Sequence, residues 1–142
     1  MQSIRTLKPP QAPLPPRVES GRLGALRRIA GEARLSRFEE PEAACALLRE
    51  QPAAAAEAYA GALLRLLPRA LGQRVVFHRP GARECSFDEL WTLGLIGAVE
   101  RGDSDNLNFA LASRVASRFR APVRFLAEGL AARIDSLPVE PI

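Results

Sequence analysis

The chemically reactive side chains of this chain are few, and one group of them is close in sequence. The only histidine, His78, lies in an apolar stretch, and Ser86 and Asp88 follow shortly after it. A serine, a histidine and a carboxylate can form a nucleophilic triad when the serine stands exposed on a strained turn. Ser86 and Asp88 match the start of a helix instead, so the sequence favours a structural or surface histidine. The enzymatic alternative would place His78 in a cleft with Asp88, Glu89 or Glu100.

Metal ligands and phosphate-binding loops are not indicated either. Cys45, His78 and Cys85 lack the spacing of a zinc site. The two cysteines have neither CxxC spacing nor a secretory context, so we expect reduced, buried thiols in a cytoplasmic protein. The chain contains no GxGxxG and no GxxxxGK motif. The sequence therefore predicts no cofactor and no metal ion, and it favours a protein that is not an enzyme.

Arginine supplies nearly all of the positive charge and the one binding chemistry that the composition supports. The 142 residues include 19 arginines and one lysine, and the net charge is +4. Basic and acidic blocks alternate along the chain, so many of these charges can pair inside the fold. A helical arginine face could still track phosphates or contact a protein partner. The predicted contact residues are Arg27, Arg28, Arg114, Arg118 and Arg124. Genome composition explains the arginine content equally well.

Apolar periodicity, prolines and capping residues together predict an all-α fold, a compact bundle of about five to six short helices. The first helix runs from a cap at Ser20 to about Phe38, and the second begins at Glu40 and Pro41. The third starts at Pro52 and reaches about Leu67, where Pro68 ends or kinks it. The last two span about 107–119 and about 122–135, the latter opened by Pro122.

The clearest helix start is Ser86-Phe87-Asp88-Glu89, which matches a capping box. This helix runs to about Arg101, and Gly102 stops it. Because it is apolar nearly all round, we expect it to be a central, buried helix. Its glycines, Gly94 and Gly97, would permit a close helix crossing, within the monomer or across a two-fold dimer. The predicted core anchors are Phe87, Leu90, Trp91, Leu126 and Leu130.

The chain reads as one domain with two extensions. Residues 1–19 form a flexible, basic, proline-rich arm, residues 20–137 the single helical domain, and residues 138–142 a frayed tail. The stretch 73–79, QRVVFHR, is of strand type, so we expect an extended connector or a short isolated strand near 74–78. No apolar run is long enough to span a membrane.

These observations lead to two hypotheses about function. The preferred one is a non-enzymatic protein-interaction module, an adaptor or regulator, whose helical body binds a protein partner while the basic arm adds electrostatic reach. The alternative is a small nucleic-acid-binding protein that uses an arginine-rich helical face. Phosphate contacts make affinity fall steeply with salt, so a salt titration separates the two.

Overall fold

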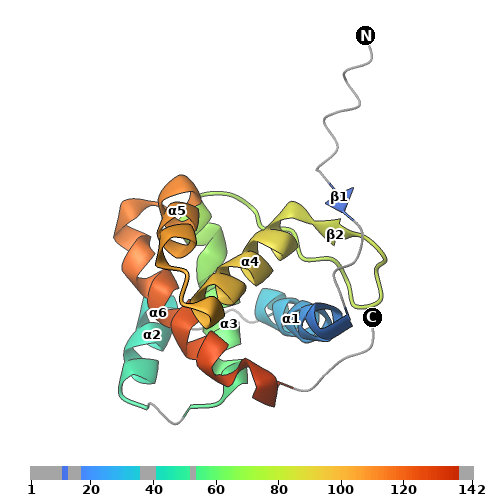
Figure 1. Ribbon diagram of the computed structural model, residues 1–142. Helices are drawn as coiled ribbons and strands as arrows, with labels where there is room; N and C mark the ends of the chain where they lie inside the picture. Colours follow the sequence, from blue (N-terminus) through green and yellow to red (C-terminus); the bar gives the residue numbers. More distant parts are fainter. Residues whose placement is uncertain (1–10, 13–16, 36–40, 52–53, 138–142) are drawn as a thin grey trace.

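The computed structural model describes residues 11–12, 17–35, 41–51 and 54–137. Six α-helices account for most of these residues (Figure 1), which confirms the prediction of an all-α bundle. They are α1 (Arg17–Leu35), α2 (Pro41–Arg49), α3 (Ala56–Leu71), α4 (Phe87–Arg101), α5 (Ser104–Arg114) and α6 (Ser117–Arg133). A 3-10 turn, η2 (Ile134–Ser136), follows α6, and the strands β1 (Gln11–Ala12) and β2 (Cys85–Ser86) have two residues each. Most of the predicted arm, and the tail at 138–142, lie outside the described residues.

The most extensive helix contact joins α3 to α6. Leu63 and Leu66 of α3 and Leu126 and Leu130 of α6 are completely buried. These leucines recur at the three- and four-residue spacings that place side chains on one face of a helix. The two predicted anchors on α6 therefore lie in the core between the two helices.

One glycine sets how closely α6 approaches α3. A Cβ atom added at Gly129 would lie 2.1 Å from Cε1 of Tyr59, and the ring carbons Cδ1 and Cζ would also be too close. Tyr59 is itself buried, and its ring packs against Phe125 with the ring centroids 5.9 Å apart. The aromatic ring occupies the space that any side chain at position 129 would need, so this helix crossing requires glycine.

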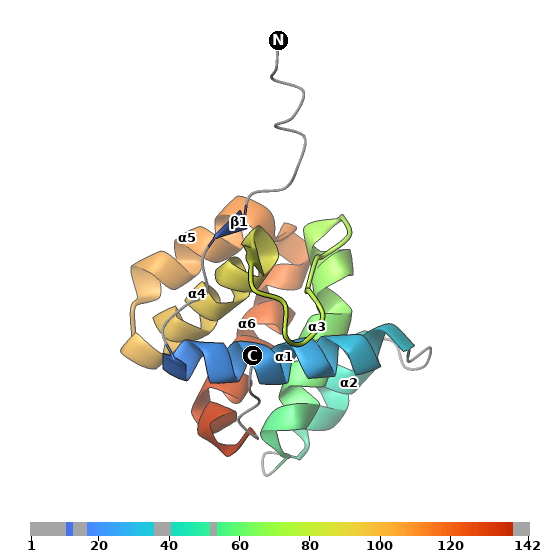
Figure 2. The same cartoon turned by 90° about the vertical axis from the view of Figure 1, so that its right-hand side faces the viewer.

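The first helix lies across the outside of α3 and also contacts α4 (Figure 2). Leu23 and Leu26 on its inner face are completely buried. The helix begins at Arg17, so Ser20 lies inside it and is not its cap. Pro15 and Pro16 immediately precede Arg17 in the sequence, and proline favours the start of a helix.

The fourth helix begins and ends where its sequence signals predict. Ser86 accepts a hydrogen bond from the Glu89 amide, and Glu89 accepts one from the Ser86 amide, which completes the capping box. At the other end Gly102 adopts a left-handed conformation, with φ of 67°. Asp103 then caps α5 by accepting a hydrogen bond from the Asn106 amide.

The expectation that α4 is buried on all sides is wrong. Leu93, Leu95 and Ile96 are buried, but the side chains on the opposite side of the helix face outward. The prediction that Phe87 is a core anchor is wrong, because its side chain is 48% exposed, whereas Leu90 and Trp91 are partly buried and pack against the core. The apolar residues of α4 therefore form two faces, one that packs into the core and one that lies on the outer side of the helix.

The break between the last two helices comes earlier than predicted. Helix α5 ends at Arg114, Val115 is extended, and α6 starts at Ser117 with Pro122 inside it. The Ala116 amide donates to the carbonyl oxygen of Ala70 at the end of α3, so a tertiary hydrogen bond replaces a helical one. The side chain of Arg120 donates from Nε to the Val115 carbonyl and stabilises the end of α5. Pro68 likewise lies inside α3, which continues to Leu71.

Residues 73–84 form a connector without strand pairing, rather than the isolated strand considered near 74–78. The strand pairing falls just after it, where β2 runs antiparallel to β1 with Ala12 opposite Cys85 and Gln11 opposite Ser86. None of the helices within the described ranges combines the length and the apolar character that crossing a membrane requires.

Candidate functional site

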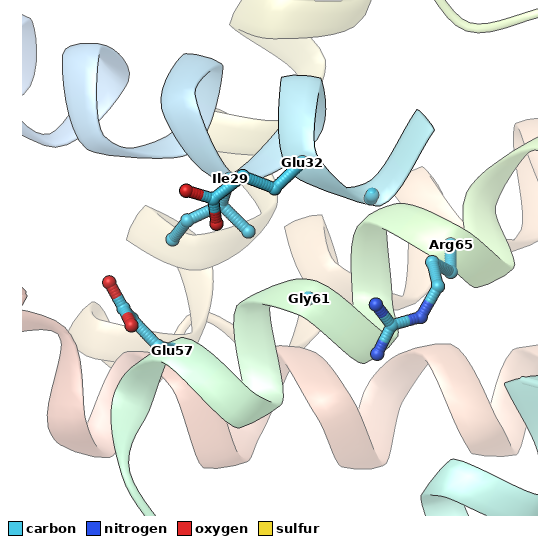
Figure 3. Close-up of a pocket in the computed structure, with 6 residues that line it drawn as sticks. Ile29, Glu32, Glu57, Gly61 and Arg65 are labelled. Carbon is cyan, nitrogen blue, oxygen red and sulfur yellow. The ribbon is translucent and has the colours of Figure 1, made fainter. Parts of the chain in front are cut away.

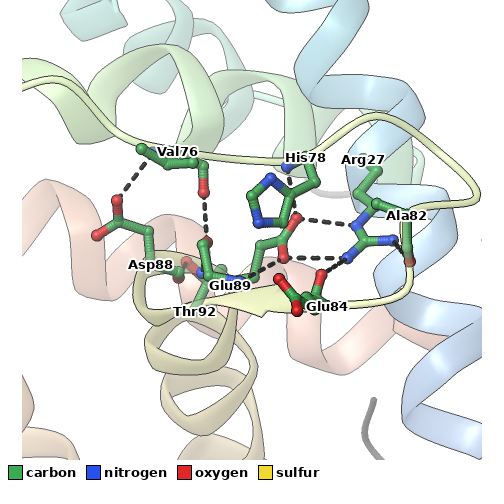
Figure 4. A network of polar contacts seen from close by, with 9 residues as sticks. Arg27, Val76, His78, Ala82, Glu84, Asp88, Glu89 and Thr92 are labelled. Atoms are coloured by element: carbon green, nitrogen blue, oxygen red, sulfur yellow. Dashed lines mark hydrogen bonds and ion pairs between the residues drawn. The ribbon is translucent and has the colours of Figure 1, made fainter. Parts of the chain in front are cut away.

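A buried ion pair between α1 and α4 organises the polar interior (Figure 4). Both Arg27 and Glu89 are completely buried, and Nε of Arg27 lies 2.8 Å from Oε2 of Glu89. The remaining guanidinium nitrogens donate to the carbonyl oxygens of Ala82 and Glu84 in the connector. A buried guanidinium needs an acceptor for each of its nitrogens, because an unpaired charge in the interior costs several kcal/mol.

Glu89 and its neighbours also hold the connector from the other side. Glu89 accepts the His78 amide at 2.7 Å, and Asp88 accepts the Val76 amide at 2.8 Å. The Ser86 hydroxyl donates to the Val76 carbonyl. Of the residues of the enzymatic hypothesis, Asp88 and Glu89 therefore lie beside the His78 segment, but the hydroxyl and both carboxylates hold backbone groups in place. Glu100 lies at the other end of α4, where it pairs with Arg22.

The two cysteines are free and buried on different elements, Cys45 on α2 and Cys85 on β2. Burial raises the pKa of the Cys85 thiol, and the negative charge of Glu89 adds to this effect. A thiol in such surroundings stays protonated at neutral pH and is a poor nucleophile. Within the described ranges, no three or more His, Cys, Asp and Glu side chains gather closely enough to hold a metal ion.

Most of the predicted contact arginines are paired within the protein. Arg27 is completely buried, so it has no exposed surface for the predicted contact with a partner or a nucleic acid. Arg28 pairs with Glu57 and Glu32, and Arg124 pairs with Glu128 and also donates to Asn108. Arg114 pairs with Asp88 at 2.9 Å. Among the described residues no ion pair involves Arg118, which stacks on the ring of Phe119.

The outward side of α4 forms an apolar surface that we call the aromatic face, made up of Phe87, Leu90, Trp91 and Gly94. Phe87 and Trp91 flank Arg114, whose guanidinium carbon lies 5.0 Å from the Phe87 ring centroid and 5.1 Å from that of Trp91. The indole Nε1 of Trp91 is buried and has no hydrogen-bond acceptor among the described residues. Packing against one paired arginine holds both aromatic side chains in place.

The glycines of α4 are not used to pack helices inside the described fold. A Cβ atom at Gly94 would meet nothing within 4 Å, and one at Gly97 would meet only the side chain of Arg101. This contrasts with Gly129, where the Tyr59 ring fills the space. Of the two explanations for these glycines, a close crossing inside the monomer is therefore wrong for the described residues, and a crossing with another chain remains.

A second surface feature, which we call the arginine groove, lies where α3, α5 and α6 meet. It is open, with a volume of about 340 Å³, and Arg69, Arg114 and Arg118 line it. None of the described residues that line it is acidic. The sequence indicated Arg114 and Arg118 but not Arg69, because Arg69 comes from a helix far away in the chain and no local pattern relates it to the other two.

Two other hollows lie on the surface that the described residues form. The one between α1 and α3 has a volume of about 130 Å³, and Glu57 and Arg65 of α3 line it opposite Ile29 and Glu32 of α1 (Figure 3). That volume is below the range of small-molecule sites, which begins at about 300 Å³. The other hollow, of about 320 Å³, is an open depression over the connector beside His78, Arg79 and Arg83.

Comparison of the chain with protein-family models, with curated proteins and with solved structures finds no match. The aromatic face and the arginine groove therefore have to be interpreted from their own geometry. They adjoin each other at Arg114, which stacks on the aromatic face and also lines the groove.

Proposed function

We propose that this protein is a non-enzymatic helical interaction module that binds a helix of a protein partner on the aromatic face of α4. The observation that carries the proposal is the pair Phe87 and Trp91, held on the outside of α4 by Arg114. Tryptophan, other aromatic residues and arginine are the side chains that contribute most to protein–protein binding energy. Side chains that are already fixed lose little conformational entropy on binding.

The open backbone at Gly94 supports a helical partner in particular. Small residues let two helix backbones approach closely, and nothing within 4 Å occupies the space beside Gly94. A helix crossing α4 here would contact both aromatic side chains and cover the glycine.

The polar residues near His78 already bind other groups of the protein, which supports a role without catalysis. The carboxylates of Glu89 and Asp88 and the hydroxyl of Ser86 bind backbone groups of the connector. The alternative function, nucleic-acid binding along Arg114, Arg118 and Arg124, receives less support, because two of these three arginines are paired with carboxylates.

The substitution Gly94→Arg tests the proposal. It places a long charged side chain on the aromatic face, and because its Cβ would have no atom of the described fold within 4 Å, the variant should fold. The matched control is Leu47→Arg, which changes a residue of α2 that is 54% exposed. Circular dichroism would establish that both variants are folded.

Each protein would be immobilised and incubated with nuclease-treated native lysate. In a separate measurement, the oligomeric state of each purified protein would be determined by sedimentation. We expect a protein that the wild type and Leu47→Arg retain and that Gly94→Arg loses. If the wild type and Leu47→Arg self-associate and Gly94→Arg does not, the partner is a second copy of this chain. Equal retention and equal oligomeric state in all three proteins would contradict the proposal.

A further inference from the structure

We propose that the partner of the aromatic face is a second copy of this chain, bound as a two-fold dimer through antiparallel α4 helices. This inference rests on the proposed function, because it names the partner that the same surface binds. Its basis is a stripe along α4 that is complementary to itself. At spacings of three or four residues, which keep side chains on one side of a helix, the stripe contains Phe87, Trp91, Gly94, Gly97 and Arg101.

Gly94 lies midway between the two ends of this stripe, Phe87 and Arg101. At a rise of 1.5 Å per residue, each end lies about 10 Å from Gly94 along the helix axis. A two-fold axis beside Gly94 therefore places Phe87 of one protomer opposite Arg101 of the partner subunit. A Cβ atom at Gly94 would meet nothing within 4 Å, so the two helix backbones can approach closely at this point.

The same axis pairs the largest side chain of the stripe with its second glycine. Trp91 and Gly97 are equally far from Gly94 in the sequence, so the indole of one protomer faces Gly97 of the partner subunit. In the monomer the side chain of Arg101 lies beside Gly97, with Nη1 3.0 Å from the position of an added Cβ atom. When this flexible side chain turns to Phe87 of the partner subunit, it uncovers Gly97 for the indole.

The two ends of the stripe are electrostatically complementary. Arg101 is exposed and makes no ion pair or hydrogen bond with the described residues, although its charge lowers the pKa of the Asp103 carboxyl through space. Phe87 is 48% exposed, and the charge of Arg114 beside it is already balanced by Asp88. A guanidinium is attracted to the face of an aromatic ring, and a two-fold dimer makes this contact twice.

The order of these groups favours an antiparallel copy over other arrangements. In a parallel pair Arg101 would lie against Arg101 of the partner subunit, where like charges repel each other. Antiparallel helices avoid this contact and also oppose their dipoles. A different protein would need an aromatic residue, small residues and a cation at matching positions in the reverse order, whereas a second copy of α4 already has them.

Sedimentation equilibrium of the full-length protein tests the predicted contact between Phe87 and Arg101. We expect a monomer–dimer equilibrium in the wild type, which Phe87→Ala and Arg101→Gln each weaken roughly fivefold or more. The double variant should dimerise about as weakly as the weaker single variant. The two residues lie about 20 Å apart in one chain, too far to couple except across the interface.

The matched control is Arg83→Gln, which removes the same charge from an exposed arginine of the connector. It should leave the dimerisation constant within about twofold of the wild type. Fully additive effects of Phe87→Ala and Arg101→Gln, or equal weakening by Arg83→Gln, would overturn the predicted contact.

A cross-linking experiment tests the position of the two-fold axis. In the dimer the residues at position 94 face each other, so Gly94→Cys should form a disulfide-linked dimer on air oxidation. Ala58→Cys, an exposed position of α3, should not, and the native thiols of Cys45 and Cys85 are buried. Equal cross-linking of the two variants, or a wild type that stays monomeric, would overturn the inference.

The lysate experiment described above separates this failure from failure of the proposed function. If the wild type stays monomeric but retains a lysate protein that Gly94→Arg loses, the aromatic face binds a different protein and the dimer is wrong. If the monomeric wild type retains no such protein, both proposals are wrong.

Discussion

Arg27 and Glu89 lie 62 positions apart in the sequence and form an ion pair that is closed off from solvent on all sides. The pair joins α1 to the first turn of α4, and through Ala82 and Glu84 it also fixes the connector. Buried pairs of this kind are sensitive to the removal of one partner, because the other is left charged and unpaired.

We therefore predict that Arg27→Met lowers the free energy of unfolding by about 3–5 kcal/mol. Glu89→Gln should also destabilise the protein, since it removes the charge while keeping the size of the side chain. In the double variant the two effects should be less than additive, because each single change already breaks the pair. Urea unfolding followed by circular dichroism measures all three. If each single variant lost less than about 1 kcal/mol of unfolding free energy, which is the range for exposed ion pairs, the buried pair would not hold α1 to α4 as described.

The same substitution at two helical glycines should have opposite effects. Gly129→Ala forces a methyl group into the Tyr59 ring, so we expect a loss of about 1–3 kcal/mol, as for overpacking of a core. Gly94→Ala meets no atom within 4 Å and should raise stability by about 0.5–1 kcal/mol through helix propensity. Thermal unfolding of the two variants compares them directly. A stabilising Gly129→Ala would mean that α6 does not approach Tyr59 as closely as described.

The cap of α5 should make stability depend on pH in acid. The pKa of Asp103 is lowered, mainly by the hydrogen bond from the Asn106 amide and further by the Asn106 side chain. A carboxylate with a lowered pKa stabilises the fold above the pKa of the unfolded chain, and this stabilisation is lost as the pH falls through the folded value.

Asp103→Ala should therefore be less stable than the wild type at pH 7, and the difference should shrink as the pH falls below 3.8, the ordinary value for this group. Denaturant unfolding between pH 2 and pH 7 measures the difference at each pH. The matched control is Asp105→Ala, which removes an acidic residue from the same turn without removing the cap. A difference between wild type and Asp103→Ala that is constant over this range would exclude a contribution from the charge of the cap.

The features that could be predicted from the sequence are those that depend on neighbouring residues. Ser86 and Glu89 define the start of α4, and Gly102 and Asp103 define the turn to α5, because each acts on backbone groups within a few positions. The spacing of apolar and polar residues along the chain was likewise enough to predict that the fold is helical.

The features that could not be predicted depend on residues far apart in the chain. The burial of Arg27 requires Glu89, and the break before α6 requires the carbonyl of Ala70, which binds the Ala116 amide. The pattern of α4 also could not distinguish a core face from an outer face, since Trp91 and Leu95 are equally apolar. The arginine groove was only partly foreseen, because Arg69 joins the other two arginines through packing alone.

The double use of Glu89 has a consequence for how this protein opens. Its carboxylate accepts the amides of Ser86 and His78 as well as the guanidinium of Arg27, so detachment of α1 would leave this buried carboxylate without its counter-charge. We therefore expect opening of the connector, fraying of the first turn of α4 and detachment of α1 to be coupled, so that the two amides exchange their hydrogens with solvent together.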